Sequence, residues 1–256
     1  MSRPRPLRDL ALAVGFLTVL PLGRTWPEEG APDAVGFYPW VGFLLGAEGW
    51  AVAWLMRARG ILDAVTLLVA GSVVVTLWAL TTRMLHWDGL ADTADGLWGS
   101  YDRERRLEIM RDSRVGSFGV TAVVMTALLQ ASACGAVLLA QRPWVLVVAP
   151  VLGRGAAAVA AWTLPAARKE GLGLTAVRKP SAYAVLAAAL ALVALLVLGH
   201  LTAPRGPFFA TLAVGILAAV LLPRLLSRRV GGMTGDLFGA VVLGVETAVL
   251  LTGALT

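Results

Sequence analysis

Residues 86–99 read HWDGLADTADGLWG, a polar stretch between long apolar runs, with three aspartates and a histidine. Asp88, Asp92 and Asp95 are spaced so that an α-helix would project all three from one face. Like charges on one face repel one another unless a cation lies between them. Carboxylates suit Mg²⁺, which substrate phosphates often complete. The spacing therefore predicts a helical magnesium site, and the alternative is a solvated helix start that Asp88 caps.

His86 precedes these aspartates by two residues. It fits a general base, a hydrogen-bond donor to a phosphate, or an interfacial side chain beside Trp87. All three roles stay open at this level. Glycines at 89, 96 and 99 would let a ligand approach the helix closely.

The next stretch, YDRERRLEIMRDSRVGSFG at 101–119, carries five arginines. Guanidinium groups match phosphate oxygens with two parallel hydrogen bonds, so Arg103, Arg106 and Arg111 are candidates for binding phosphate. The alternative partners are the neighbouring acids and lipid headgroups. Ser117 lies at the start of the next apolar run, where the backbone N–H groups of a helix start could bind an anion.

A third polar segment, RRVGGMTGD at 228–236, combines glycines with a hydroxyl and a carboxylate. Gly232 would let the backbone approach a phosphate or nucleoside closely. Thr234 would supply a hydroxyl and Asp236 a fourth carboxylate. The alternative is a plain turn in which Asp236 caps the last helix.

The elements that must position these residues are long apolar helices. The chain is 58% hydrophobic and 15% charged, against about 25% charged in soluble domains. Seven runs are long enough to span a bilayer as helices, and the alternation typical of strands is absent. We expect an all-α, polytopic membrane bundle of about seven spans in a single domain, residues 1–256. The runs are 36–56, 61–82, 115–140, 144–164, 182–203, 207–226 and 237–255.

Residues 10–22 are too short to cross a bilayer comfortably, and no small-residue cleavage site follows to support a signal peptide. If the N-terminus is cytoplasmic and the seven longer runs cross, 17 Lys and Arg lie in cytoplasmic segments and four outside. This asymmetry predicts a short N-terminal helix lying along the membrane or dipping into it. It also places the polar segments 83–114, 165–181 and 227–236 on the cytoplasmic side. We expect the membrane to be a bacterial-type cytoplasmic (inner) membrane.

Ionisable groups within the expected spans are functional candidates, because they are expensive in hydrocarbon. Arg154 is expected to pair with Glu246 or Glu48, or to line a polar cavity. Cys134, the single cysteine, is expected to be a small packing residue. The net charge is +6, but basic residues between apolar runs indicate membrane loops rather than nucleic-acid binding.

These residues together favour phosphoryl-type transfer. Metal ions would neutralise phosphates, arginines would stabilise developing charge, and a hydroxyl would be positioned in line. A substrate with a bulky or apolar part would explain the membrane setting.

The motif HWDGLADTADGLWG also resembles the cobalamin synthase family, the adenosylcobinamide-GDP ribazoletransferases. The resemblance continues through RRLEIMRDSRVGSFGV at 105–120, RKEGLG at 168–173 and GGMTGDLFGAVVLGVE at 231–246. It spans essentially the whole chain in order. Two departures are Val19, where the family often has Arg, and the acid Glu48. The first weakens any role of the N-terminal segment in substrate binding, and neither touches the aspartate motif.

The resemblance implies transfer of the adenosylcobinamide phosphate moiety of adenosylcobinamide-GDP to α-ribazole or its 5′-phosphate. The products would be adenosylcobalamin or its 5′-phosphate, and GMP, in the last steps of vitamin B12 biosynthesis with Mg²⁺ as cofactor. It assigns the metal and pyrophosphate to Asp88, Asp92 and Asp95, with Asp236 an additional ligand, and catalysis to Asp88 and His86, the latter as the base. The implied substrate-binding residues are Arg106, Arg111, Arg114, Ser117, Gly232 and Thr234.

Two other functions remain open. A CDP-alcohol-type phosphotransferase also uses aspartates and Mg²⁺ to displace a nucleotide, but its paired motifs lie farther apart. A transporter would use Glu48, Arg154 and Glu246 along an ion path, yet it needs no clustered cytoplasmic aspartates. The expected partners are the small-molecule substrates and membrane lipid, without nucleic acid, and an oligomer is open.

Overall fold

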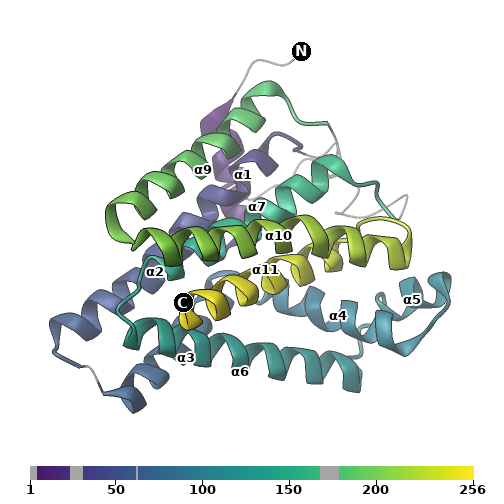
Figure 1. The fold of residues 1–256 in the computed structure, drawn as a ribbon. Coiled ribbons are helices and arrows are strands. Elements are labelled where there is room, and N and C mark those ends of the chain that lie inside the picture. The colour runs from purple at the N-terminus through teal and green to yellow at the C-terminus, as the bar shows by residue number, and fades with distance from the viewer. Residues whose placement is uncertain (1–4, 24–30, 62, 168–178) are drawn as a thin grey trace.

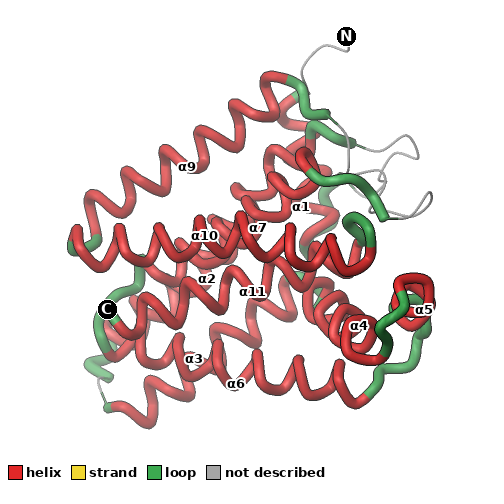
Figure 2. The backbone as a smooth tube through the Cα atoms, turned by 45° about the vertical axis from the view of Figure 1, so that its right-hand side comes forward, coloured by secondary structure: helices red, strands yellow, loops and turns green. Residues whose placement is uncertain are grey.

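The computed structural model describes residues 5–23, 31–61, 63–167 and 179–256, which form helices and connecting segments (Figures 1 and 2). The all-α prediction is confirmed for this part of the chain. The RKEGLG segment at 168–173 lies outside it. The elements are α1 (Pro6–Leu17), the 3-10 helix η1 (Ala34–Phe37), α2 (Tyr38–Ala58), α3 (Ala64–Thr81), α4 (Leu85–Gly99), α5 (Arg103–Ile109), α6 (Ser117–Leu139), α7 (Val145–Thr163), α9 (Ala182–Thr202), α10 (Arg205–Val230) and α11 (Gly235–Leu255).

Six of these helices, α3, α6, α7, α9, α10 and α11, are long and apolar enough to cross a membrane. The chain is therefore a multi-pass membrane protein, and the expected count of about seven is close. The run at 36–56 forms α2, whose 21 residues include tryptophans, glycines and Glu48, and so are less apolar. With 12 residues, α1 is too short to span.

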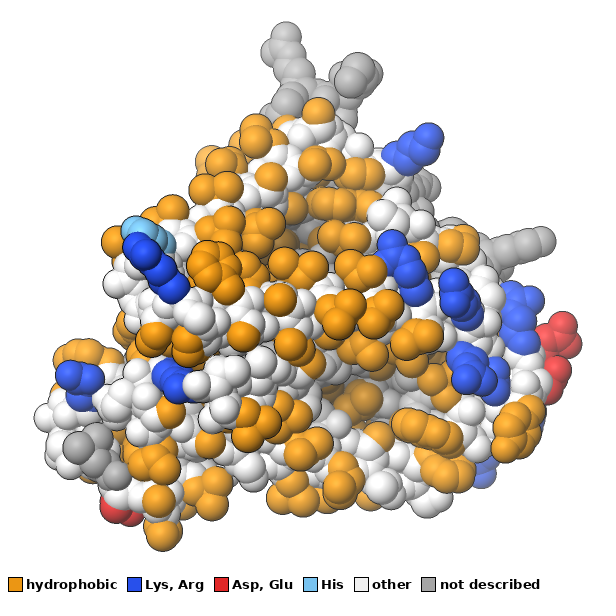
Figure 3. All heavy atoms as spheres, viewed as in Figure 1, with side chains coloured by type: hydrophobic (Ala, Val, Ile, Leu, Met, Phe, Trp, Pro, Cys, Tyr) orange, Lys and Arg blue, Asp and Glu red, His pale blue; other side chains and the backbone are white. Residues whose placement is uncertain are grey.

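The outer surface matches this assignment, because hydrophobic side chains cover much of the face formed by α9 and α10 (Figure 3). Lys and Arg side chains gather at the end where α5 and the C-terminal end of α10 lie. Exposed leucines and valines on α9 and α10 would meet lipid tails in a bilayer. The polar end is therefore the end that carries the aspartate motif.

The centre of the bundle is α7, with 15 of its 19 residues buried. It packs against α2, α10 and α11. A Cβ added to Gly42 of α2 would come within 2.5 Å of the Val151 Cα, so the two backbones touch at this point. Small residues give transmembrane helices this close approach.

An ion pair lies inside this core. Arg154 of α7 donates to Glu246 of α11, and both side chains are nearly inaccessible. Of the two expected partners, Glu246 is therefore the one that pairs, while Glu48 instead accepts a hydrogen bond from Thr81 at 2.8 Å. Cys134 is fully buried among apolar side chains, which confirms its packing role.

Candidate functional site

The aspartate motif forms α4, so the helix predicted from the spacing is confirmed. A tight turn precedes it, in which Arg83 and Met84 adopt left-handed backbone conformations with φ of 51° and 55°. Such conformations are uncommon for residues other than glycine. They let the chain reverse between α3 and α4, so that α4 packs against α6 and α11.

The three aspartates share a helix but not an environment. Asp88 is exposed, Asp92 is half-buried and Asp95 is buried. Among the described residues, no group of three or more His, Cys, Asp or Glu is arranged to hold a metal ion. Mg²⁺ is commonly held by one or two carboxylates together with substrate phosphates and waters. Asp88 and Asp92 satisfy that smaller requirement, so the magnesium site stays a prediction for those two residues.

Asp95 has a different set of partners. Its Oδ2 accepts the backbone N–H of Gly116 at 2.7 Å, and its Oδ1 accepts that of Gly119 at 2.8 Å. These N–H groups belong to the start of α6, where helices leave N–H groups without an intrahelical partner. A Cβ on either glycine would lie within 2.5 Å of an Asp95 carboxylate oxygen. Asp95 therefore caps α6 from α4, and its predicted role as a metal ligand loses support because both oxygens are engaged.

Replacing Asp95 with Ala is expected to lower the free energy of unfolding by about 2–3 kcal/mol, because two charge-assisted hydrogen bonds are lost. Thermal unfolding of the detergent-solubilised protein measures this loss. Asp102 supplies the control, since it caps the start of its own helix α5 through one exposed bond to the Arg105 N–H. Its change to Ala should cost about 1 kcal/mol. Equal losses in the two variants would contradict the cap assigned to Asp95.

Asp236 reaches the site because two glycines let α4 and α11 approach closely. A Cβ on Gly89 would lie 2.6 Å from the carbonyl oxygen of Asp236, and one on Gly239 would lie 2.8 Å from the carbonyl oxygen of His86. The first turn of α11 therefore lies directly against α4. This brings the backbone of the fourth predicted carboxylate next to the segment that carries Asp88 and Asp92.

Thr234 and Gly232 hold the turn before α11. The Thr234 hydroxyl accepts the Leu237 N–H at 3.2 Å, so Thr234, not Asp236, caps the helix through its side chain. Gly232 has a φ of 151°, and a Cβ there would collide with the backbone of residues 165–167. Both residues are buried. The structure thus gives them structural contacts, and their predicted contact with substrate stays a prediction.

Arg106, a predicted phosphate ligand, is also buried and engaged. Its Nε donates to the Ser100 carbonyl and its Nη1 to the Arg229 carbonyl, each at 2.8 Å. Arg103 similarly donates to the Val230 carbonyl at 2.8 Å. These carbonyls lie just after α4 and at the C-terminal end of α10, where helices carry partial negative charge. Arg106 therefore links α5 to the end of α4 and to α10, and its predicted contact with phosphate stays a prediction.

Replacing Arg106 with Ala is expected to lower the free energy of unfolding by about 2 kcal/mol while leaving the KM for the nucleotide substrate little changed. Exposed Arg228 of α10 provides the control, since its change to Ala should leave stability unaltered. Thermal unfolding and steady-state kinetics measure the two effects. A large rise in KM without loss of stability would show that Arg106 binds substrate after all.

His86 lies on the buried side of α4, against α11. Positions 86 and 88 point in roughly opposite directions on a helix. Burial lowers the pKa of the His86 imidazole well below its ordinary value, and the positive charge of Arg154 adds to this. His86 is therefore neutral and does not lie beside Asp88, so its role as a base stays a prediction.

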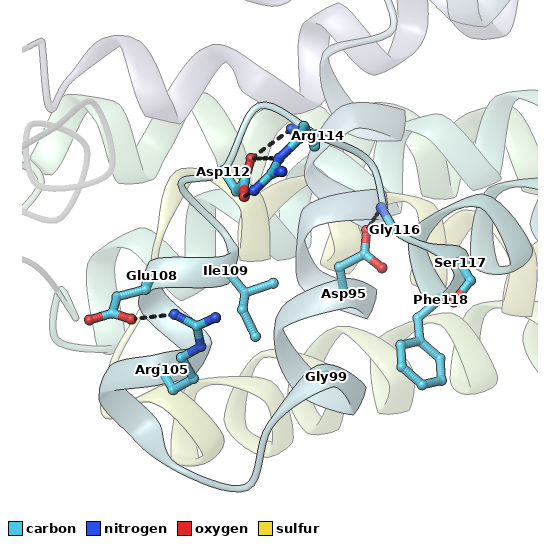
Figure 4. A pocket seen from close by; sticks show the side chains of 10 residues that line it. All are labelled: Asp95, Gly99, Arg105, Glu108, Ile109, Asp112, Arg114, Gly116, Ser117 and Phe118. Carbon is cyan, nitrogen blue, oxygen red and sulfur yellow. Dashed lines mark hydrogen bonds and ion pairs between the residues drawn. The ribbon is translucent and has the colours of Figure 1, made fainter.

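A cavity of about 240 Å³ opens between the C-terminal end of α4, α5 and the start of α6 (Figure 4). Two predicted substrate residues, Arg114 and Ser117, line it, whereas Arg111 is exposed outside it. Asp95 and Gly99, which the sequence singled out for other roles, also line it. Sequence reasoning missed the remaining side chains, although the i, i+3 spacing of Arg105 and Glu108 signals a helical ion pair. The missed side chains are Arg105, Glu108, Ile109, Asp112 and Phe118.

The chain is similar to known proteins over nearly its whole length. The family model described as Cobalamin-5-phosphate synthase matches residues 9–254. The chain belongs to this family. It is 38% identical to the "Adenosylcobinamide-GDP ribazoletransferase" of Bradyrhizobium diazoefficiens, over 97% of this chain and 94% of the relative. Proteins of the same name from Syntrophobacter fumaroxidans and Stutzerimonas stutzeri are each 39% identical, over 94% and 96% of this chain and 96% and 97% of theirs. No solved structure matches.

Within the Cobalamin-5-phosphate synthase family, the geometry divides the motif residues into two groups. Asp88, Asp92 and Asp236 lie in or beside the segment where α4 meets α11, and Arg114 and Ser117 line the cavity. The residues of the second group stabilise the fold by capping a helix, by forming hydrogen bonds between helices or by packing in a tight turn. It comprises Asp95, Arg106, Gly232 and Thr234.

Proposed function

We propose that this enzyme transfers the adenosylcobinamide phosphate moiety of adenosylcobinamide-GDP to α-ribazole or its 5′-phosphate. The products are adenosylcobalamin or its 5′-phosphate, and GMP. The observation that carries this proposal is the match, over 94–97% of the chain, to relatives named for this activity. A family match of this extent also favours the transferase over a CDP-alcohol phosphotransferase or a transporter.

The reaction is a phosphoryl-type displacement. The ribazole hydroxyl oxygen forms a bond to the phosphorus attached to cobinamide, and the bond between that phosphorus and the bridging oxygen breaks. GMP leaves with the electron pair of that bond, and the hydroxyl proton is released to GMP or to solvent. Asp88 and Asp92, with Asp236 beside them, would hold Mg²⁺ against the pyrophosphate. When bound, the metal neutralises charge on the phosphates. Exposure of Asp88 and the close crossing of α4 and α11 support this placement.

The site would face the cytoplasm from a bacterial-type inner membrane. Arginines surround the aspartate end, in the turn before α4, in and after α5, and at the end of α10. Positive residues are typical of the cytoplasmic side of membrane proteins. The nucleotide substrate would then enter from the cytoplasm, while the exposed apolar helices lie in lipid.

GMP release tests the proposal directly. Purified detergent-solubilised protein is given adenosylcobinamide-GDP and α-ribazole, with and without Mg²⁺. In further reactions each of the two substrates is omitted in turn. We expect GMP and the cobamide product only when both substrates and the metal are present. A folded protein that releases no GMP under any of these conditions would refute the transferase. GMP without ribazole would indicate hydrolysis instead.

A further inference from the structure

We propose that the cavity between α4, α5 and the start of α6 binds the guanine base of the departing nucleotide. This inference rests on the proposed function, which supplies a GDP moiety. At about 240 Å³ the cavity is smaller than the roughly 300 Å³ at which pockets for whole drug-sized ligands begin. It therefore suits one ring system better than an entire nucleotide.

The charges that line the cavity do not favour a bare phosphate. Arg105 Nη1 lies 2.9 Å from Glu108 Oε2, and Arg114 Nη2 lies 2.7 Å from Asp112 Oδ2. The Arg114 hydrogen bonds lower the pKa of Asp112 to about 2, so this carboxylate stays ionised at neutral pH. Counting Asp95, the lining of the cavity contains three carboxylates and two guanidinium groups. A dianion would be repelled by such a lining.

Guanine matches the same lining. Along one edge it presents O6, an acceptor that arginine can bind, next to the N1–H and N2 amino donors. A carboxylate and a guanidinium held side by side offer the complementary acceptor and donor. The Arg105–Glu108 pair on α5 has this form and lines the cavity. Adenine places an amino donor where guanine has O6, so an arginine there would reject it.

Apolar contacts are available for the faces of the ring. Ile109 of α5 and Phe118 of α6 lie on either side of Asp95 in Figure 4, and both line the cavity. Nucleobases stack on aromatic side chains whatever their edges carry.

The position of the cavity agrees with the proposed chemistry. Asp95 lines the cavity. Asp88 lies at the exposed end of the motif, seven residues earlier on the same helix. That separation is roughly 10 Å along the helix axis. A pyrophosphate beside Asp88 and a base beside Asp95 would thus be bound by two sites on one rigid helix.

Equilibrium dialysis with radiolabelled GMP, IMP and AMP tests this site without the transfer reaction. We expect the purified full-length protein to prefer GMP over AMP by about tenfold or more. Arg105→Ala and Glu108→Gln should each weaken GMP binding about five- to hundredfold and leave AMP binding nearly unchanged. IMP, which lacks the N2 amino group, should bind less tightly than GMP to the wild type and be less affected by Glu108→Gln.

Arg228→Ala and Glu104→Gln are the matched controls, because both side chains are exposed and lie outside the lining. Arg105 and Glu108 are also largely exposed, so all four variants should fold, and thermal unfolding checks this. Equal affinity of the wild type for GMP and AMP would overturn the inference. So would unchanged GMP binding in the lining variants, or an equal loss for both nucleotides, which would indicate a phosphate site. Selective GMP binding without ribazole transfer would overturn the proposed function alone.

Discussion

Asp88→Asn is expected to lower GMP release about 10²- to 10³-fold while leaving the protein folded. The scale is that of removing one group that stabilises charge developing in a transition state. Asp88 is exposed at the start of α4, so the amide has no packing to disturb. Asn keeps the size of the side chain and removes the negative charge that a magnesium–pyrophosphate complex needs. Initial rates across a range of Mg²⁺ concentrations measure the effect.

Glu104→Gln provides the control for Asp88, because it also removes one exposed negative charge at this end of the molecule. It should retain its rate and its dependence on Mg²⁺. Asp95→Asn is the informative companion, since Asp95 is expected to act on stability and not on metal affinity. Normal turnover by Asp88→Asn, or the same rise in the Mg²⁺ requirement for Asp88 and Asp95 variants, would refute the division of the motif.

Arg154→Ala is expected to lower the free energy of unfolding by about 3–5 kcal/mol, the largest loss of stability among the variants considered. The reason is that the substitution removes the cation and leaves its partner, the Glu246 carboxylate, in place. Glu246 would be buried without its cation, in a core where both side chains are almost fully enclosed. Denaturation in detergent, followed by circular dichroism, measures the change. Arg154 contacts neither the cavity nor Asp88 in the structure, so the KM for nucleotide should change little in protein that remains folded.

A double-mutant cycle separates the ion pair from packing. Replacing both Arg154 and Glu246 with methionine removes both charges at similar volume, and the double variant should be much more stable than either single variant. Strictly additive losses would show that the pair does not couple α7 to α11. Arg224, exposed on α10, is the control, since Arg224→Ala should leave stability within about 0.5 kcal/mol.

The features that depend on local periodicity were predictable from the sequence. Long apolar runs predict spanning helices because a bilayer requires satisfied backbone groups over a fixed thickness. The intervals between Asp88, Asp92 and Asp95 predict one helix face because side-chain direction repeats with the helical turn. Both predictions hold in the structure. Fold class and the presence of an acidic helix at a polar end are therefore properties of the sequence pattern.

Only the tertiary structure decided which contacts each polar residue makes, because its partners lie far away in the chain. Asp95 caps a helix that starts 22 residues later, and Arg106 donates to a carbonyl 123 residues away. Asp236 reaches α4 because Gly89 and Gly239 remove the side chains that would hold the helices apart. The spacing of residues along a helix gives the direction in which each side chain points, but not the residues that it meets. For that reason the sequence and its family resemblance indicated four metal ligands. The fold instead leaves Asp88 exposed and Asp92 half-buried, brings the backbone of Asp236 against α4, and engages Asp95 in the cap of α6.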